Sequence, residues 1–382
     1  MIVLRIGIMG GTFDPIHSGH ISISMQTMRA LSLDKVMLLP DGDPPHKRAA
    51  SKYDRLEMCR LAALGQDGLF VSDEEVKRNG VTYTVETLTA LCLQHPDVSW
   101  YYIIGADTLD VLDTWRCIEK VARMCTFAVC GRADDPGSME IMRRLHREIG
   151  ANFIRTDVTG PDISSTDIRN RRRTGKDIAG LVPEKVARHI KRRGLYLCNM
   201  SRTEILRALD RRLKPARYVH TLGVAATARQ LAPRYGVEVG KADIAALLHD
   251  CAKSMRLDDM RNLITASALD VDAEELASDN VIHAPAGCIL AEREFGVHDP
   301  EILSAIRRHT LGGADMTALE KLIYVCDCVE PGRTDFPGLS EARQLAQEDL
   351  NAAECKCASL TVNHLRTLGL QPHRMTLEVL KS

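Results

Sequence analysis

The sequence predicts two domains of different fold class, a parallel α/β domain followed by an all-α domain. The chain has 382 residues, which at about 150 residues per domain suggests two domains, or three. Through residues 1–160, short apolar runs alternate with longer amphipathic segments, whereas strand-like runs nearly vanish after about Cys198. The alternation indicates strands joined by crossover helices, and its loss indicates that helices pack on helices. We expect a first domain over residues 1–198 and a second over residues 203–382.

The individual elements follow from the periodicity of apolar residues. Continuous apolar runs are typical of a parallel sheet that is covered on both faces. Spacings of three and four residues mark amphipathic helices instead. The expected strands are Ile2–Met9, Lys35–Leu39, Leu69–Val71, Trp100–Ile104 and Thr126–Val129. The expected helices are Tyr53–Leu64 and Thr84–Leu93 in the first domain, then Thr203–Leu213, His220–Ala232, Ala242–Lys253, Ala284–Phe295, Glu301–Arg308 and Ala318–Val325 in the second.

Composition excludes several classes of protein. Hydrophobic residues make up 45% and charged residues 26% of the chain, which is ordinary for a globular protein and excludes a disordered one. The net charge of -1 gives no reason to expect a nucleic-acid or membrane partner. The twelve scattered cysteines are typical of free thiols in a reducing cytoplasm. No signal peptide or membrane-spanning run is expected, and the sequence leaves open whether the chain forms a homo-oligomer.

The end of the first strand carries a candidate phosphate site. The strand runs into Gly10 and Gly11, where the backbone can approach a ligand closely. A helix that starts near His17–Gly19 would point free N–H groups at an anion. His17 and His20 are three residues apart and therefore share one face of its first turn. A Gly-Gly turn or a histidine pair is by itself more often structural, but the whole string from Gly10 to His20 is far more specific.

A second phosphate-binding segment is Ile163-Ser164-Ser165-Thr166-Asp167-Ile168-Arg169. Ser164, Ser165 and Thr166 are suited to cap a helix start and to leave N–H groups and hydroxyls for phosphates. Arg169 lies one turn inside that helix, from where it would reach the same phosphates.

These segments resemble the nucleotidyltransferase superfamily, and most closely bacterial nicotinate-nucleotide adenylyltransferases. His17-Ser18-Gly19-His20 looks like the (T/H)xGH signature, and Pro44-Pro45-His46-Lys47 looks like the PPHK loop of that family. Gly105-Ala106-Asp107 with Trp115 is similar to its GAD…W segment, and residues 163–169 are similar to its ISSTxIR motif. The resemblance covers residues 1–198 and implies a Rossmann-like nucleotidyltransferase domain.

The resemblance implies transfer of AMP from ATP, bound with Mg²⁺, to nicotinate mononucleotide, which gives deamido-NAD and pyrophosphate. Such a transfer depends mainly on positioning and charge stabilisation. The residues assigned to charge stabilisation are His17, His20, Lys47 and Arg169. Those assigned to binding ATP or substrate are Gly10, Gly11, Thr12, Phe13, His46, Thr84, Gly105, Asp107, Trp115, Arg132, Ser164, Ser165 and Thr166. A pantetheine-phosphate adenylyltransferase is the alternative, and the sequence does not settle nicotinate against nicotinamide.

The second half carries a candidate metal site. His249 and Asp250 follow an apolar helix, where a buried carboxylate is costly unless it has a partner such as a divalent metal. Several histidines with carboxylates and no thiolate set suit Fe, Mn, Co or Zn. The candidate ligands are His220, His249, Asp250, His283, His309 and Asp327.

The order H…HD…H…H…D resembles the HD phosphohydrolase superfamily, and most closely the YqeK-type symmetrical dinucleoside-tetraphosphate hydrolases. Residues 283–287, 308–310 and 328–333 add to the likeness, which covers residues 203–382. It implies two divalent metals, with Fe favoured, that are bridged by Asp250 and promote displacement at phosphorus. Lys253 and Arg333 would contact substrate phosphates, and diadenosine tetraphosphate would be cut to two ADP. The alternatives are another nucleotide polyphosphate, or a nucleotide sensor that regulates the adenylyltransferase.

Overall fold

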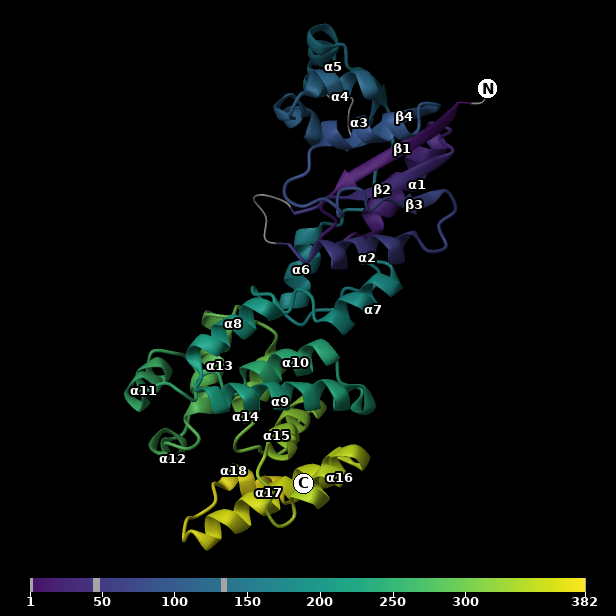
Figure 1. The fold of residues 1–382 in the computed structure, drawn as a ribbon. Helices are drawn as coiled ribbons and strands as arrows, with labels where there is room; N and C mark the ends of the chain where they lie inside the picture. Colours follow the sequence, from purple (N-terminus) through teal and green to yellow (C-terminus); the bar gives the residue numbers. More distant parts are fainter. Residues whose placement is uncertain (1–2, 44–48, 132–135, 382) are drawn as a thin grey trace. The chain divides into compact units, whose positions relative to one another are not determined.

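The structure divides into two compact units. The computed structural model describes residues 3–43, 49–131 and 136–381 (Figure 1). The first unit comprises Met1–Arg169 and Ile178–His189, and the second comprises Asn170–Asp177 and Ile190–Ser382. The chain therefore passes from one unit to the other three times, within and around two helices, α6 (Ser165–Arg173) and α7 (Glu184–Arg193).

The first unit is built on a six-stranded sheet of parallel strands in the order β3-β2-β1-β4-β5-β6. The fold class predicted for this half is confirmed. Strand β1 runs through both glycines to Gly11 because parallel pairing with β2 continues to that residue. Strand β6 was not predicted, since it has only four residues and lies at the sheet edge, partly exposed. The strands are β1 (Leu4–Gly11), β2 (Lys35–Pro40), β3 (Leu69–Val71), β4 (Val98–Gly105), β5 (Thr126–Cys130) and β6 (Asn152–Arg155).

Helices connect these strands and cover both faces of the sheet (Figure 1). The helices predicted for this half are present, and Ser51 caps α2 by accepting a hydrogen bond from the Asp54 N–H at 3.1 Å. The central strands are almost completely buried, as in Ile8, Leu38 and Phe127, which explains their continuous apolar sequences. The helices that connect the strands are α1 (Ser18–Ala30), α2 (Lys52–Ala63), α3 (Thr84–Gln94), the 3₁₀ helix η1 (Ala106–Thr114), α4 (Ile118–Met124) and α5 (Pro136–Ile149).

The second unit is helical throughout the part of the chain that the structure describes, as predicted. Helix α9 starts at Pro215, earlier than expected, because proline fits the first helical position, where no N–H is needed. The α10 helix ends at Leu248, directly before His249. The elements are α8 (Arg202–Arg212), α9 (Pro215–Leu231), η2 (Ala232–Tyr235), α10 (Val239–Leu248), α11 (Leu257–Thr265), α12 (Ala273–Ala277), α13 (His283–Arg293), α14 (Pro300–Arg308), α15 (Ala318–Val329), α16 (Leu339–Glu348), α17 (Leu350–Thr367) and α18 (Arg374–Val379).

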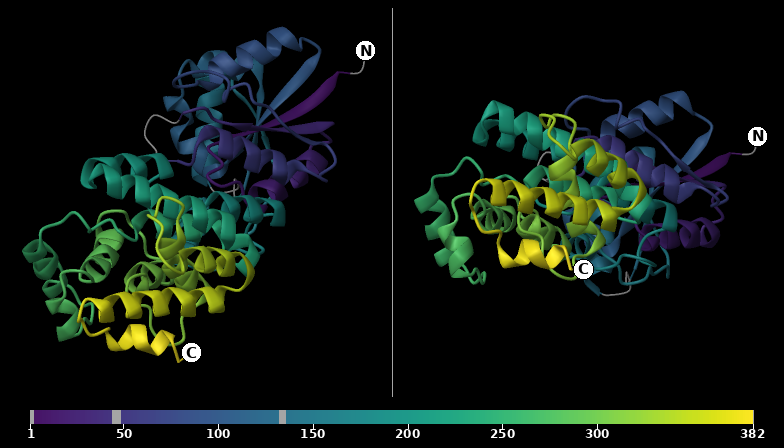
Figure 2. Two further views of the ribbon diagram at one scale, coloured as in Figure 1. Left: turned by 60° about the horizontal axis from the view of Figure 1, so that its bottom comes forward. Right: turned by 90° about the horizontal axis from the view of Figure 1, so that it is seen from below.

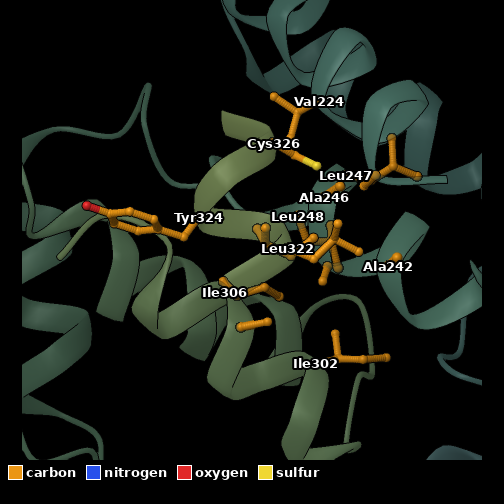
Figure 3. Packing of buried hydrophobic residues seen from close by; sticks show 14 of the residues in the cluster. Val224, Ala242, Ala246, Leu247, Leu248, Ile302, Ile306, Leu322, Tyr324 and Cys326 are labelled. Carbon is orange, nitrogen blue, oxygen red and sulfur yellow. The ribbon is translucent and has the colours of Figure 1, made fainter. Parts of the chain in front are cut away.

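The core of this unit lies between α9, α10, α14 and α15. Helix α10 is buried on nearly all sides, so its sequence is apolar rather than amphipathic. In Figure 3 the side chains of Leu248, Leu322 and Ile306 converge, whereas the Tyr324 ring extends away from them. Helices α16, α17 and α18 lie side by side in both views of Figure 2.

A pair of glycines brings backbone against backbone in the second unit. A Cβ atom on Gly240 of α10 would lie 2.9 Å from the Lys191 carbonyl oxygen and even closer to Gly194. Gly194 itself has a φ of +62°, which an L side chain rarely adopts. Both positions therefore require glycine.

Two further expectations concern cysteines and membranes. All twelve cysteines are free thiols. Within the described ranges, no helix is both long and apolar enough to cross a membrane.

Candidate functional site

A cleft of about 880 Å³ opens in the first unit at the carboxyl ends of β1, β4 and β5. Strand β1 lies between β2 and β4. The chain adds β2 and β3 on one side of β1 and β4 to β6 on the other, so the strand order reverses direction at β1. Ligands of open α/β sheets bind in the crevice at such a switch point. The starts of α1 and α6 also reach the cleft, through Gly19 and Ser165, and a helix N-terminus favours an anion.

The close approach of β1 to β4 depends on Gly10. A Cβ atom at this position would collide with the Tyr102 hydroxyl, which lines the same cleft. Tyr102 in turn contacts Trp115 edge to face, with ring centroids 5.4 Å apart. Glycine at position 10 therefore allows an aromatic wall beside the turn.

His17 and His20 stack at the start of α1, with ring centroids 3.7 Å apart. Burial lowers the pKa of His17 to about 4. Burial, with His17 next to it, lowers the pKa of His20 to about 3. The backbone N–H of His17 donates to His20 Nδ1 at 3.2 Å, so the proton of the neutral His20 ring is on Nε2. His20 is thus neutral near pH 7 in this structure, with its Nε2–H free to act as a hydrogen-bond donor.

The start of α6 is held by its own side chains. Ser164 Oγ accepts from the Asp167 N–H at 3.0 Å, which is the predicted cap. Ser165 Oγ donates to the Pro15 carbonyl oxygen at 2.9 Å. Arg169 donates to the Asp14 carbonyl oxygen at 2.7 Å. These contacts tie α6 to the loop after β1.

The structure brings many of the predicted residues of this half to one cleft. Four predicted residues do not line the cleft, namely Thr12, Phe13, Thr166 and Arg169. Two of them make other contacts: Thr12 Oγ1 donates to Asp41 Oδ2 at 3.0 Å, and Arg169 Nη2 donates to Thr166 Oγ1 at 3.1 Å. His46, Lys47 and Arg132 lie outside the described residues. Those that line the cleft are Gly10, Gly11, His17, His20, Thr84, Gly105, Asp107, Trp115, Ser164 and Ser165.

Sequence reasoning missed two acidic residues in the same cleft, Asp41 and Glu75. Glu75 accepts hydrogen bonds from Thr82 at 2.9 Å and Thr87 at 2.8 Å. Burial raises the pKa of Glu75, although both threonine hydroxyls oppose the rise. No local motif surrounds Glu75, so only the fold places it here.

In the second unit, four of the other five predicted ligands gather around the Asp250 carboxylate. Oδ2 lies 3.4 Å from His249 Nε2 and 3.9 Å from His220 Nε2. Oδ1 lies 3.2 Å from His283 Nε2 and 3.7 Å from His309 Nε2. The two oxygens of one carboxylate thus face two different pairs of imidazoles.

The sixth residue, Asp327, closes the first of these sets. Its Oδ1 is 2.9 Å from His220 Nε2 and 3.9 Å from His249 Nε2. Desolvation favours the neutral acid, but His220, His249 and Arg333 favour the carboxylate and hold the pKa of Asp327 below its usual range. Three groups of donor atoms in this cluster, namely residues 220/249/250, 249/309/327 and 250/283/309, have all members within 4.8 Å of one another.

The outer nitrogens of three imidazoles fix which nitrogen faces the cluster. His249 Nδ1 donates to the Ala246 carbonyl at 2.6 Å, and His309 Nδ1 donates to the Ile306 carbonyl at 2.7 Å. His220 Nδ1 lies 3.1 Å from Glu330 Oε1. Each Nε2 is therefore available as a metal ligand. His283 differs, because Lys253 Nζ lies 3.0 Å from its Nδ1.

The cluster fits a divalent metal on its own chemistry. The buried Nε2 atoms of His220 and His249 face carboxylate oxygens but make no hydrogen bond of good geometry, and His249 is 0% exposed. Buried polar atoms are costly to leave unpaired, and imidazole with carboxylate is a ligand set for Fe, Mn, Co or Zn. The geometry therefore provides overlapping groups of donor atoms for a divalent metal, and two of the three groups include Asp250.

Three cations border these sets. Arg217 Nη1 lies 2.7 Å from Asp250 Oδ2, and Arg333 Nη2 lies 2.6 Å from Asp327 Oδ1. Lys253 also donates to the Asn280 carbonyl at 3.1 Å. Arg217 was missed, although it stands three residues before His220 on α9 and so shares its face.

The fold and these sites define a nucleotidyltransferase-type α/β domain that is joined to a helical domain with a histidine–aspartate centre. Residues 8–171 match the cytidylyltransferase-like family model, and residues 217–332 match the HD domain model.

Curated relatives match about half of this chain. A probable nicotinate-nucleotide adenylyltransferase of Synechococcus sp. (strain JA-3-3Ab) is 39% identical over 196 residues, which are 50% of this chain and 95% of the relative. One of Desulfatibacillum aliphaticivorans is 40% identical over 220 residues, covering 51% of this chain and 100% of the relative. A crystal structure of a predicted HD superfamily hydrolase involved in NAD metabolism from Clostridium acetobutylicum shares 37% identity over 48% of this chain and 96% of that one, with a TM-score of 0.46. In its first half the chain belongs to the nicotinate-nucleotide adenylyltransferase family, and an HD domain follows.

Proposed function

We propose that the first unit transfers AMP from ATP to nicotinate mononucleotide and releases pyrophosphate, forming deamido-NAD. The observation that carries this proposal is the cleft of about 880 Å³ at the switch point of the sheet, in a chain of this family. The cleft combines an anion-binding edge, at His20 and the start of α6, with an aromatic wall of Tyr102 and Trp115.

Each side of the cleft has its own task in this proposal. His20 donates its Nε2–H to a phosphate oxygen as a neutral group, and the start of α6 adds backbone dipoles. Trp115 provides a face for the nicotinate ring. Mg²⁺, when bound with ATP, neutralises phosphate charge. Arg169 acts as a positioning residue, since it ties α6 to the loop after β1 through the Asp14 carbonyl.

The test is synthesis of deamido-NAD from ATP and nicotinate mononucleotide, followed by chromatography. We expect turnover that His20→Ala reduces at least about tenfold, because one hydrogen bond to developing charge is lost. The exposed His298→Ala in the second unit is the matched control. Transfer to phosphopantetheine instead would overturn the substrate assignment, and a rate on nicotinamide mononucleotide equal to the nicotinate rate would overturn acid selectivity.

For the second unit, we propose metal-dependent hydrolysis of diadenosine tetraphosphate to two ADP. The observation that carries this proposal is the Asp250 carboxylate, whose oxygens face His220 and His249 on one side and His283 and His309 on the other. We assign His220, His249, Asp250 and Asp327 to one divalent metal, and Asp250, His283 and His309 to the second.

Bound metals of this kind supply Lewis acidity and a nucleophile from water at neutral pH. The protein's own groups then position the phosphates. Arg217, Lys253 and Arg333 border the ligand sets and are suited to bind phosphate oxygens. Burial, with Arg217 and Arg333 nearby, lowers the pKa of Lys253. A bound anion would restore the charged form of this lysine, because an opposite charge nearby favours it.

The experiment incubates the full chain with diadenosine tetraphosphate, aerobically and also anaerobically with Fe²⁺ or Mn²⁺, and separates the products. We expect ADP as the only product. His249→Ala should abolish its formation, whereas His298→Ala, at an exposed residue, should retain it. ATP with AMP would overturn symmetrical cleavage. Absence of turnover with every metal would overturn the assigned hydrolysis and favour another nucleotide or a sensor.

A further inference from the structure

A second cleft, of about 740 Å³, adjoins the histidine–aspartate cluster. His309 and Asp327 of the cluster form part of its wall, together with Arg333. The rest of the wall comes from outside the ligand set, and hydrolysis of a phosphate chain alone does not account for it. A volume in this range is typical of a small-molecule site.

Most of the remaining wall comes from one face of α17. Leu360 and Thr361 lie three and four residues after Cys357, and His364 lies four and three residues after them, so these side chains form one stripe along the helix. Phe336, from the loop between α15 and α16, completes the wall and is 39% exposed. An exposed aromatic ring beside a charged cluster indicates a surface for a planar ligand.

The loop that carries Phe336 is held in place. Gly338 has a φ of +91°, which an L side chain rarely adopts, and the place of a Cβ atom there lies 2.7 Å from Leu360 Cδ2, so glycine suits the close packing of this loop on α17. The Leu339 N–H donates to the Phe336 carbonyl at 3.1 Å. Arg343 donates to the Val329 and Glu330 carbonyls, each at 3.0 Å. The wall is therefore already formed in the structure.

We propose that this cleft holds the nucleoside of a nucleotide whose phosphates lie at the cluster, with the base stacked against Phe336. Only the placement of the phosphates at the cluster rests on the proposed hydrolysis; the placement of the nucleoside does not. The lining chemistry divides accordingly: Arg333 is the cation next to the metal ligands, whereas Phe336 and Leu360 offer apolar faces. Asn363, at the far end of α17, supplies an amide for the polar edge of a base.

Photolabelling locates the base without relying on hydrolysis. The full chain, loaded with Mn²⁺, is irradiated with 8-azido-ADP, digested and mapped by mass spectrometry. We expect modified peptides that contain Phe336 or residues 357–367. Labelling at the first-unit cleft is mapped separately. The inference is overturned if label in the second unit falls only outside these segments, or if none falls in the second unit.

A specificity ratio tests the same contact. For Phe336→Ala we expect the kcat/KM for diadenosine tetraphosphate, divided by that for inorganic tetrapolyphosphate, to fall roughly tenfold, because base–aromatic stacking is lost. Leu370→Ala, at a residue that is 49% exposed and outside the cleft, is the matched control. An unchanged ratio overturns the inference. Photolabel in the cleft without hydrolysis would instead overturn the proposed activity and leave the nucleoside site standing.

Discussion

Glu330 Oε1 lies 3.1 Å from His220 Nδ1, although the two residues are 110 positions apart in the sequence. The second Glu330 oxygen accepts from the Gly332 N–H at 2.6 Å, so the carboxylate is fixed at both ends. Glu330 is buried, and it orients the His220 ring so that Nε2 faces Asp327. It thus acts on the metal site through another residue.

Glu330→Gln tests this positioning role. We expect a loss of metal affinity of about 10- to 100-fold, as is usual when the partner of a metal-binding histidine is changed. Calorimetric titration of the full chain with Mn²⁺ measures it. Glu348→Gln, at an exposed position on α16, is the control. Equal Mn²⁺ affinities in wild type and Glu330→Gln would contradict the role.

Metal content distinguishes the shared carboxylate from a ligand of one set. Asp250→Asn should lower metal binding in both sets, because each of its oxygens faces a different imidazole pair. His283→Gln should lower it only in the set with His309. Elemental analysis of Mn²⁺-loaded protein after gel filtration gives the stoichiometry. Equal losses in the two variants would argue against a bridging Asp250.

The stability of the first unit should fall in acid because of His20. Its folded pKa is about 3, whereas the unfolded value is 6.5, so below pH 6.5 the unfolded chain binds more protons and stability decreases as pH falls. The contribution is fully present above pH 6.5. From pH 7 to 5, we expect His20 to cost about 2 kcal/mol.

His20→Gln should remove that loss. Urea unfolding followed by tryptophan fluorescence measures it in the first unit, because both tryptophans, Trp100 and Trp115, lie there. His146→Gln, at an exposed histidine of the same unit, should keep the wild-type acid sensitivity. If His20→Gln loses as much stability as wild type between pH 7 and 5, then His20 is not the acid-sensitive group.

The core beneath the metal ligands should be sensitive to truncation. Leu248 is 0% exposed and directly precedes His249. Leu248→Ala should lower the free energy of unfolding by about 3 kcal/mol, since a cavity is left in the packed core. Thermal unfolding followed by circular dichroism measures the loss of helix, and tryptophan fluorescence identifies the transition of the first unit, which holds both tryptophans. Leu370→Ala, at an exposed site, should change little. Similar effects of the two variants would contradict this account of the core.

Sequence reasoning succeeded where chemistry or periodicity is local. Apolar runs such as Thr126–Val129 predicted central strands, because burial on both faces leaves no polar alternation. The sequence singled out Asp250 because a carboxylate beside an apolar helix is costly to bury unless a cation or a metal pairs with it. The structure brings the six candidate ligands into one cluster, and their role as ligands stays a prediction.

What escaped prediction depends on long-range contacts. Glu330 and Glu75 sit in no periodic pattern that marks their partners. The four-residue β6 is too short for an alternation to register. Phe336 gains its place only through the packing of its loop on α17. Such features are set by tertiary structure rather than by any one segment.

The boundary between the units also has a practical consequence. Arg172 belongs to the second unit although it precedes residues 178–189 of the first. Its side chain is 4% exposed and paired with Glu238, with one nitrogen–oxygen distance of 3.4 Å. Cutting the chain after residue 198 would therefore separate a buried guanidinium from its carboxylate, which is strongly destabilising. The two units are thus interleaved along the polypeptide between residues 170 and 189.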